Sequence, residues 1–349
     1  MARNCENISV LLNEKDWILT TLAIIGSGIA GRSLLYALAK EKKSIEKITL
    51  VSSDKFTSPC TLSSTAIVAP RGLSTGHSPL GDLLLEGYKE FSEHVTLEQP
   101  EGVEIVPQYT GASEKLDAFQ LRYPHGKIQK LFLNKETYIA EDRAFMVNPE
   151  IYSEWLLNES KILLENHLEI IQDLVTNVEQ EERVHIKTQN GRTISFDKVI
   201  FTAGTYNRFW KDLGPESVLK TSKPVQGSYL EFKNVSLMVP SFSMSLDGDN
   251  LVWSEKNKTL LIGSTTQEAY HVLPPYVELQ AIYERLVNAV NLKLPDYSQG
   301  EIKVGLREKA KKREPYIIQE GHLLFFGGLY KNGFTLSLKM SRNLSHQYL

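Results

Sequence analysis

The apolar and polar positions near the start of the chain predict a strand, a helix and a second strand. Residues 21–25 form a short apolar run, residues 31–41 are rich in Leu and Ala, and residues 47–52 are apolar again. Two strands joined by a helix are typical of a βαβ unit, because parallel strands need a long crossover connection. The pattern therefore predicts a parallel sheet around residues 21–52.

The rest of the chain mixes helical stretches with alternating ones. Alternation over residues 103–112 and 119–124 predicts antiparallel strands, and residues 225–265 are again strand-like. Asn190-Gly191 lies between two strand-like runs and predicts a hairpin turn. We also expect strands at 198–202, 301–306 and 322–328, and helices at 79–95, 149–166, 275–293 and 333–348.

These elements predict a discontinuous organisation. Nucleotide-binding patterns occur at the start and near residues 198–204, and the chain closes in a strand, a turn and a helix. The simplest fold class is α/β plus antiparallel β, with a Rossmann-like domain that carries an inserted, mostly antiparallel substrate domain. The expected bounds are 1–20 for an N-terminal extension, 21–78, 143–222 and 300–349 for the nucleotide domain, and 79–142 and 223–299 for the substrate domain.

Composition and charge exclude several classes of protein. A net charge of -3 creates no strong field toward nucleic acid or membrane, and no apolar run reaches the length of about 18 residues that spans a bilayer. Only two cysteines, Cys5 and Cys60, are present, and the first residues lack the pattern of a secretory signal. We expect a cytoplasmic protein. The His and Cys residues lack metal-ligand spacing, so no metal is expected.

A glycine motif points to a dinucleotide. Gly26, Gly28 and Gly31 form G-x-G-x-x-G between the first strand and its helix. In this context the glycines allow a tight turn, a close approach to pyrophosphate and close helix packing, and the helix N-terminus attracts phosphate. The alternative is a glycine-rich structural turn. The expected binding residues in this turn are Gly26, Ser27, Gly28, Ile29, Ala30 and Gly31.

The acid that usually follows this motif is missing. A carboxylate at the end of the second strand normally binds the ribose hydroxyls. Ser52 stands at that position, followed by Ser53 and Asp54. Ser52 offers one hydroxyl, and Asp54 is expected in the following turn. The motif by itself therefore leaves both NAD and FAD open.

Six segments in chain order resemble the D-amino-acid oxidase and glycine oxidase family of FAD enzymes. The segments are "DKFTSPCTLSSTAIVAP" (54–70), "DRAFMVNPEIYSEWL" (142–156), "DKVIFTAGTYN" (197–207), "KPVQGSYL" (223–230), "VGLREKAKKREPYII" (304–318) and "GGLYKNGFTLS" (327–337). The resemblance implies an FAD-dependent oxidoreductase that oxidises a small amino acid or secondary amine by hydride transfer, with O2 or another electron acceptor. A homo-oligomer is compatible with it.

The resemblance also implies roles for individual residues. Arg307 would anchor the substrate carboxylate, for which its planar fork is suited, and Lys331 would place positive charge beside the flavin. We expect FAD to be non-covalent, because Cys60 does not match the family's covalent positions. The residues expected to contact FAD, besides the glycine turn, are Ser52, Ser53, Thr61, Ser63, Ser64, Val175, Ala203, Gly204, Arg307, Lys331, Asn332, Gly333, Phe334 and Thr335.

Departures from the family pattern keep other functions open. Ala66 replaces a loop glycine, Leu329 a histidine and Lys312 an aspartate. One alternative is the related flavin domain that oxidises a carboxymethylaminomethyl group on tRNA wobble uridine, which would need a basic face. Another alternative is a flavin-binding accessory protein without turnover.

Overall fold

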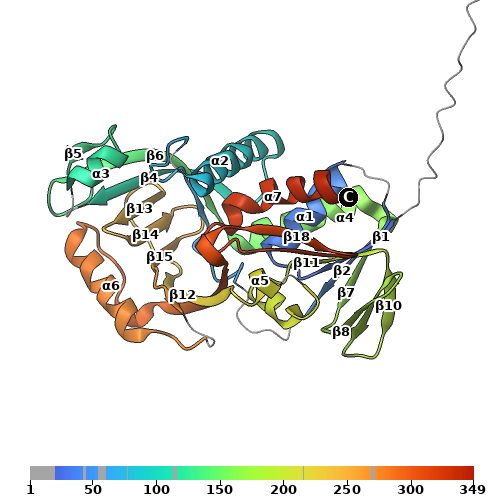
Figure 1. Cartoon of the computed structure of the whole chain (residues 1–349). Coiled ribbons are helices and arrows are strands. Elements are labelled where there is room, and N and C mark those ends of the chain that lie inside the picture. Colours follow the sequence, from blue (N-terminus) through green and yellow to red (C-terminus); the bar gives the residue numbers. More distant parts are fainter. Residues whose placement is uncertain are drawn as a thin grey trace, which may run out of the picture.

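The computed structural model is organised around two large β-sheets (Figure 1). It describes residues 20–41, 45–53, 60–76, 78–112, 116–214, 216–268 and 272–349. In Figure 1 the parallel sheet and its helices lie on the right, and the antiparallel sheet lies on the left. This arrangement confirms the predicted fold class.

The six-stranded sheet has the order β18-β19-β11-β1-β2-β7. Every neighbouring pair in it is parallel except β18 and β19, which are antiparallel. The predicted parallel unit at residues 21–52 is therefore confirmed. The strands are β1 (Thr20–Ile25), β2 (Ile45–Ser52), β7 (Leu168–Gln172), β11 (Lys198–Phe201), β18 (Tyr316–Glu320) and β19 (Leu323–Gly327).

Helices cover one face of this sheet. Apolar side chains of α1 such as Leu34 and Leu38 are fully buried and share a core with Leu50 of β2 and Leu336 of α7. Burying side chains of this size stabilises the fold by about 1.5–3 kcal/mol each. The four covering helices are α1 (Ile29–Glu41), α2 (Pro79–Glu98), α4 (Pro149–Leu164) and α7 (Gly333–Tyr348).

A small antiparallel sheet packs on the opposite face. It contains β8 (Val175–Gln180), β9 (Val184–Thr188) and β10 (Thr193–Phe196), and its buried Ile186 and Phe196 share a core with Phe201 of β11. Gly191 adopts a φ of 83° in the turn between β9 and β10, which confirms the predicted hairpin.

The second large sheet is mostly antiparallel. Its main path runs β16-β12-β15-β14-β13-β4-β6-β3, while β17 pairs with β12 and β5 with β6. Helix α6 (Tyr276–Ala289) covers it through Ile282 and Leu286, which share a core with the fully buried Trp253. The strands are β3 (Ile67–Val68), β4 (Val103–Ala112), β5 (Lys127–Gln129), β6 (Thr137–Val147), β12 (Lys223–Phe232), β13 (Phe242–Leu246), β14 (Asp249–Ser254), β15 (Thr259–Gly263), β16 (Gln267–Glu268) and β17 (Glu301–Lys309).

The strand expected at residues 119–124 is wrong. Residues 119–122 belong to helix α3 (Leu116–Arg122), and the Phe119 and Tyr123 rings pack with centroids 4.7 Å apart and planes inclined by 31°. Apolar residues at 119, 121 and 123 fit the two-residue period of a strand. Residues 119 and 123, four positions apart, also lie on one face of a helix, so a segment this short fits both structures. A further short helix is α5 (Glu216–Leu219).

Strand pairing crosses the domain bounds predicted above. β17 lies within the range assigned to the nucleotide domain but pairs with β12 along its whole length. Conversely, Gly87 of α2, a helix assigned to the substrate domain, lies so close to α7 that a Cβ on it would be 2.6 Å from the Thr335 oxygen. The division at residues 79, 143, 223 and 300 stays a prediction.

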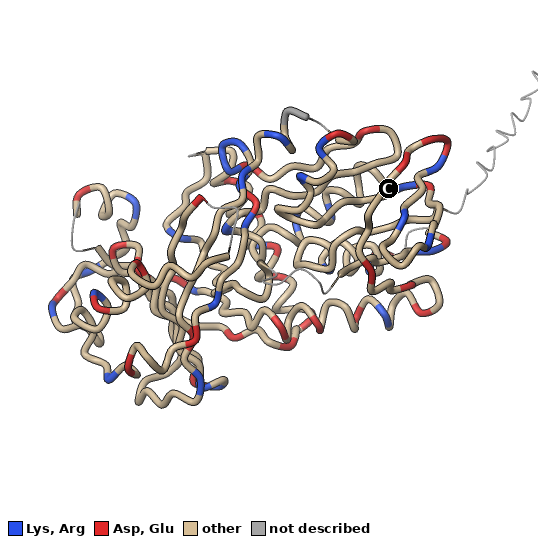
Figure 2. Tube along the Cα trace, turned by 90° about the horizontal axis from the view of Figure 1, so that it is seen from below, with Lys and Arg blue, Asp and Glu red and all other residues tan. Residues whose placement is uncertain are grey.

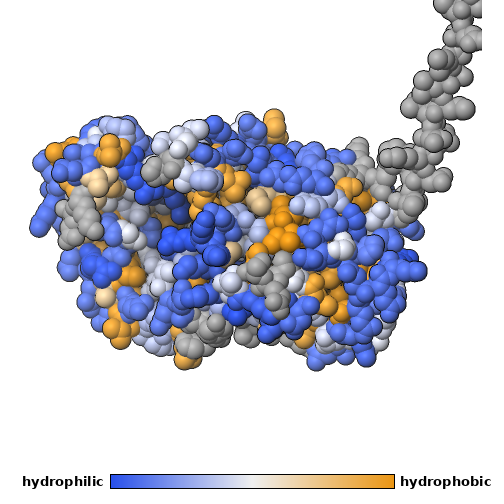
Figure 3. Space-filling view, in the orientation of Figure 1, coloured by the Kyte–Doolittle hydropathy of each residue, from blue (hydrophilic) through white to orange (hydrophobic). Residues whose placement is uncertain are grey.

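Charged and apolar groups are spread over the surface. Figure 2 shows Lys and Arg interspersed with Asp and Glu along the whole trace. On the face seen in Figure 3, apolar residues form separate small areas among hydrophilic ones. No helix in the described part of the chain is long and apolar enough to cross a membrane.

Candidate active site

A cavity of about 1030 Å³ lies where the two large sheets meet. Its walls include residues that follow β1, β2, β7 and β11, and residues of β4, β13, β14 and β17. Ligands of doubly wound sheets bind outside the carboxyl ends of the strands, and this volume is at the upper end of the range for small-molecule sites. The cavity therefore has room for a long ligand that runs from one sheet to the other.

The glycine turn is packed tightly against β11. Gly26 has a φ of 111°, and a Cβ on it would lie 2.9 Å from the Ala203 backbone. A Cβ on Gly31 would overlap the carbonyl oxygen of Gly26, which also accepts a hydrogen bond of 2.8 Å from the Thr202 hydroxyl. Gly31 therefore acts in packing and does not itself line the cavity.

The start of α1 presents donors to the cavity. The Ile29 N–H donates to Thr61 Oγ1 at 2.9 Å, so the Thr61 hydroxyl keeps its own proton for another acceptor. A Cβ on Gly28 would meet only this Oγ1, at 3.2 Å. The first N–H groups of a helix have no partners within the helix and lie at its positive end. These donors and the open space above Gly28 fit the diphosphate of a dinucleotide.

The part of the cavity beside β2 and β7 contains an acid that the sequence analysis did not include among the site residues. Ser52 and Ser53 line the cavity, Asp54 lies outside the described residues, and Ser52 is paired with Gln172 of β7. Asp173 follows directly, lines the cavity and is 6% exposed. Its carboxylate accepts from the Leu174 N–H at 2.8 Å and the Asn190 N–H at 3.1 Å. The sequence could have indicated this residue, because an acid that directly follows a buried parallel strand lies at the ligand-binding edge of the sheet.

At the other end of the cavity, the Arg307 side chain lies over a part of the antiparallel sheet that is formed by glycines. Gly227 of β12 faces Gly305 of β17, so neither strand places a side chain on that part of the sheet face. The Arg307 guanidinium fills this space: a Cβ on Gly227 would lie 2.6 Å from Nη1 and would overlap Nη2 and Cζ. Gly227 was not expected as a site residue, because its role depends on the pairing of distant strands.

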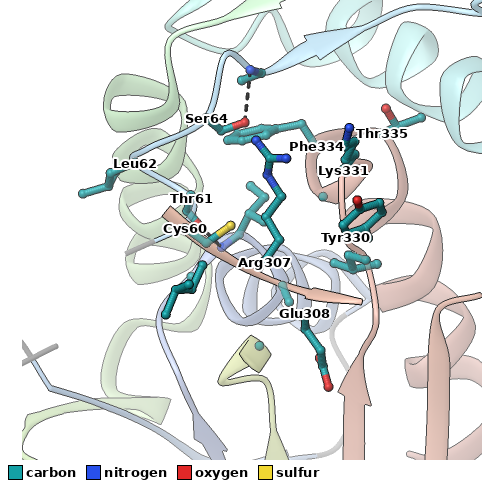
Figure 4. Close-up of a pocket in the computed structure, with 18 of the residues that line it drawn as sticks. Cys60, Thr61, Leu62, Ser64, Arg307, Glu308, Tyr330, Lys331, Phe334 and Thr335 are labelled. Atoms are coloured by element: carbon teal, nitrogen blue, oxygen red, sulfur yellow. Dashed lines mark hydrogen bonds between the residues drawn. The ribbon is translucent and has the colours of Figure 1, made fainter. Parts of the chain in front are cut away.

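Arg307 is ready to bind an acceptor. Its Nη1 is buried and has no hydrogen-bond partner, and the guanidinium points into the cavity near Ser64 and Lys331 (Figure 4). A buried donor without an acceptor costs about 1–3 kcal/mol. A ligand carboxylate at this point would remove that cost.

Lys331 approaches the same space from the turn before α7. Desolvation lowers the pKa of Lys331 to about 8, and the charges of Arg307, Arg71 and Arg313 contribute to the shift. The N-terminus of α7 begins two residues later, where Asn332 O accepts from the Leu336 N–H at 2.9 Å. Positive charge therefore gathers on this side of the cavity.

Glu308, next to Arg307 on β17, points the opposite way (Figure 4). Burial raises its pKa to about 7, and its carboxyl accepts from the Tyr316 hydroxyl at 2.7 Å and the Gly328 N–H at 2.9 Å. Asn207 donates to the Tyr316 oxygen at 3.2 Å and accepts from the Ala203 N–H at 2.9 Å. This network fixes two turns of the cavity wall and was not foreseen, because its members meet only in the fold.

Four non-glycine residues of the cavity wall have a left-handed backbone. The φ values are 43° for Ala66, 53° for Arg71, 49° for Asp247 and 48° for Tyr330. This conformation is costly for L-residues and tends to occur at functional sites. It also accounts for the glycine that the resembled family has at the position of Ala66.

The structure brings most of the predicted residues to one cavity. Ser63 is an exception, because it packs on β17, where a Cβ on Gly305 would be 3.0 Å from the Ser63 Cβ. Asn332 and Gly31 also do not line the cavity. The predicted residues that line it are Gly26, Ser27, Gly28, Ile29, Ala30, Ser52, Ser53, Thr61, Ser64, Val175, Ala203, Gly204, Arg307, Lys331, Gly333, Phe334 and Thr335.

Comparisons with known proteins agree with this geometry. Residues 21–346 match the model of the FAD dependent oxidoreductase family DAO, and no curated protein matches the sequence significantly. The fold is similar to glycine oxidase from Bacillus cereus ATCC 14579, with 17% identity, a TM-score of 0.74, and 93% of this chain and 95% of that chain covered.

Two other solved structures share the fold. Iminodiacetate oxidase from Chelativorans sp. BNC1 has 17% identity, a TM-score of 0.73, and coverage of 93% and 94%. L-α-glycerophosphate oxidase from Mycoplasma pneumoniae, with FAD bound, has 14% identity, a TM-score of 0.75, and coverage of 94% of both chains. At such identity the structures show the fold alone, while the family match identifies the cofactor. The chain belongs to the DAO family and is an FAD-dependent oxidoreductase.

Proposed function

We propose that this enzyme oxidises a small amino acid or secondary amine at the carbon that carries the nitrogen. The observation that carries the proposal is the buried, unpartnered Nη1 of Arg307 in the cavity wall. A planar guanidinium binds a carboxylate through two parallel hydrogen bonds. An amino acid held in this way would present its amine-bearing carbon in a fixed direction.

The chain's own residues provide binding and electrostatics. FAD supplies the hydride acceptor. Gly26, Gly28 and the first turn of α1 would hold its diphosphate. The N-terminus of α7 and Lys331 would favour negative charge at the substrate end of the cavity. We assign no side chain as a base, because an amine that arrives neutral needs none.

The other features of the proposal are O2 as electron acceptor, non-covalent FAD and a cytoplasmic location. Desolvation raises the pKa of the Cys60 thiol, which disfavours the thiolate that a covalent link would need. The low cysteine count supports a reducing compartment. Self-association stays a prediction.

The tRNA alternative has less support. Binding to tRNA would require a basic face to neutralise phosphates. The net charge is -3, and Figure 2 shows both signs of charge interspersed along the trace. The accessory-protein alternative is tested by measuring whether any amine reduces the flavin.

Anaerobic titration of the purified enzyme tests the proposal. Glycine, N-methylglycine and proline are added in turn, and reduction is followed by the loss of flavin absorbance. We expect at least one of these amines to reduce the flavin. Arg307→Gln should raise its apparent dissociation constant roughly 10- to 150-fold, the equivalent of about 1.5–3 kcal/mol for a hydrogen bond to a charged group.

Arg192→Gln serves as the matched control, because Arg192 is exposed and lies outside the cavity wall. Its titration should follow that of the wild type. A yellow protein that no amine reduces would favour the accessory function. Unchanged binding in Arg307→Gln would show that another group holds the carboxylate.

A further inference from the structure

The substrate end of the cavity holds more positive charge than one carboxylate requires. Arg71, Arg122, Arg307 and Lys331 all line it. Within the described ranges, none of these four side chains forms an ion pair with an acid. Uncompensated cations in one cavity repel each other, so the arrangement favours an anionic ligand.

The cations are close enough to affect one another. Desolvation lowers the pKa of the Arg71 guanidinium, and the charges of Arg122 and Arg307 lower it further. Arg122 Nη2 donates to the Arg71 carbonyl at 2.6 Å, which ties helix α3 to the loop after β3. Arg71 and Arg307 also both lower the pKa of Lys331.

Three acids line the cavity, and they lie differently relative to these cations. The Glu308 carboxyl points away from the cavity and is bound by Tyr316 and Gly328. Asp247 lines the cavity from the turn between β13 and β14. Asp173 belongs to the opposite end of the cavity, after β7.

An amino acid with a single carboxylate would leave some of these four cations without an anionic partner. Its single carboxylate occupies Arg307, and Lys331 lies at the start of α7, where negative charge is expected on the flavin. Arg71 and Arg122 remain, and they come from two other segments, the loop after β3 and helix α3. Polar residues of the antiparallel sheet, Gln108 and Ser243, complete this region of the wall.

We propose that the substrate is a dianionic amine, whose second anionic group binds Arg71. The group is a carboxylate or a phosphonate, since both accept two hydrogen bonds from a guanidinium. Arg122 acts as a positioning residue that holds the Arg71 loop. The inference rests on the proposed function, because it takes Arg307 as the anchor of the first carboxylate.

The contribution of the second anionic group to binding can be measured with two ligands that contain no amine and therefore cannot be oxidised as amines. Thiodiacetate carries two carboxylates, and methylthioacetate is the same skeleton with one of them replaced by hydrogen. Binding to the FAD-loaded enzyme is measured by calorimetry and by the shift in flavin absorbance. We expect thiodiacetate to bind roughly 10- to 100-fold more tightly, as one further charged hydrogen-bonded contact implies.

Variants assign the difference to Arg71. Arg71→Gln should bring thiodiacetate down to the affinity of methylthioacetate without changing the latter, and Arg71→Lys should keep part of the difference. Arg307→Gln should weaken both ligands. Arg192→Gln removes a cation outside the cavity wall and should change neither by more than about twofold.

Amine substrates then distinguish the two kinds of second anion. The specificity constant kcat/KM is compared for N-methylglycine, N-carboxymethylglycine and N-phosphonomethylglycine, and a dianionic amine should be preferred. The second anion site is wrong if thiodiacetate and methylthioacetate bind with equal affinity, or if Arg71→Gln weakens the binding of both ligands equally. If N-methylglycine still reduces the flavin through Arg307, the proposed function survives that result; if no amine does, the proposed function itself fails.

Discussion

The two ends of the cavity use glycine for opposite purposes. At the nucleotide end, Gly26 and Gly31 carry no side chain, so the main chain of the turn lies directly against Thr202 and Ala203, which follow β11. At the substrate end, Gly227 excludes a side chain so that the Arg307 guanidinium can lie on the sheet. We therefore expect the nucleotide end to bind its ligand through backbone groups whose positions the fold fixes. We expect the substrate end to bind its ligand through charged side chains, which rest on the sheet but are not part of it.

The largest effect is expected where a glycine substitution strains the nucleotide end. Gly26→Ala places a Cβ at a φ of 111° and 2.9 Å from the backbone of Ala203. Backbone cannot yield as a side chain can, so we expect about 1–3 kcal/mol of lost stability and no bound FAD after purification. Thermal unfolding and the FAD content measure this.

Gly191→Ala is the control for backbone strain alone. Gly191 has a φ of 83°, but nothing lies within 4 Å of a Cβ on it. This variant should lose some stability and keep its FAD. If Gly26→Ala keeps FAD equally well, the close approach of the turn to β11 does not matter.

The substrate end should respond differently to the same kind of change. Gly227→Ala meets the flexible end of Arg307, which can move aside without disturbing the sheet. We expect normal FAD content and stability, but methylthioacetate binding weakened roughly 10- to 150-fold, as for loss of Arg307. Gly81→Ala, whose Cβ would meet the Ser78 hydroxyl oxygen at 3.0 Å outside the cavity wall, should bind normally. A Gly227→Ala variant that unfolds would remove the contrast between the two ends.

The same contrast explains what the sequence could predict. The glycine turn depends on a strand and helix next to it in the chain, so spacing alone located it. Asp173 and Glu308 gain their roles from Asn190 and Gly328, which lie beyond the reach of local patterns. Phe119 was misassigned because a seven-residue helix is too short to show its period. Ser63 has a hydroxyl that could bind the cofactor, but its side chain packs against Gly305 and does not line the cavity.

A smaller change sharpens the comparison within the nucleotide end. Ser52→Glu restores the acid that usually binds ribose, so FAD should bind about tenfold more tightly, roughly half of a charged contact after side-chain ordering. Titration of FAD-free protein measures this, and Ser52→Ala controls for loss of the hydroxyl. Weaker binding of FAD by Ser52→Glu would show that Asp173, at the same edge of the sheet, already holds the place.

The smallest effect concerns the charge of Lys331. Its pKa is lowered to about 8, so the ammonium loses its proton as the pH rises through that value, and an anionic ligand then loses one attractive charge. Because Lys331 is exposed, the loss should be modest, at most about fivefold for 0.2–1 kcal/mol. Methylthioacetate stays ionised throughout, so its affinity should fall between about pH 7 and 9. In Lys331→Arg, where the guanidinium keeps its charge, the profile should be flat. A wild-type profile that is already flat, or one that Lys331→Arg does not change, would show that Lys331 does not act on the ligand, and the substrate end would then depend on its arginines.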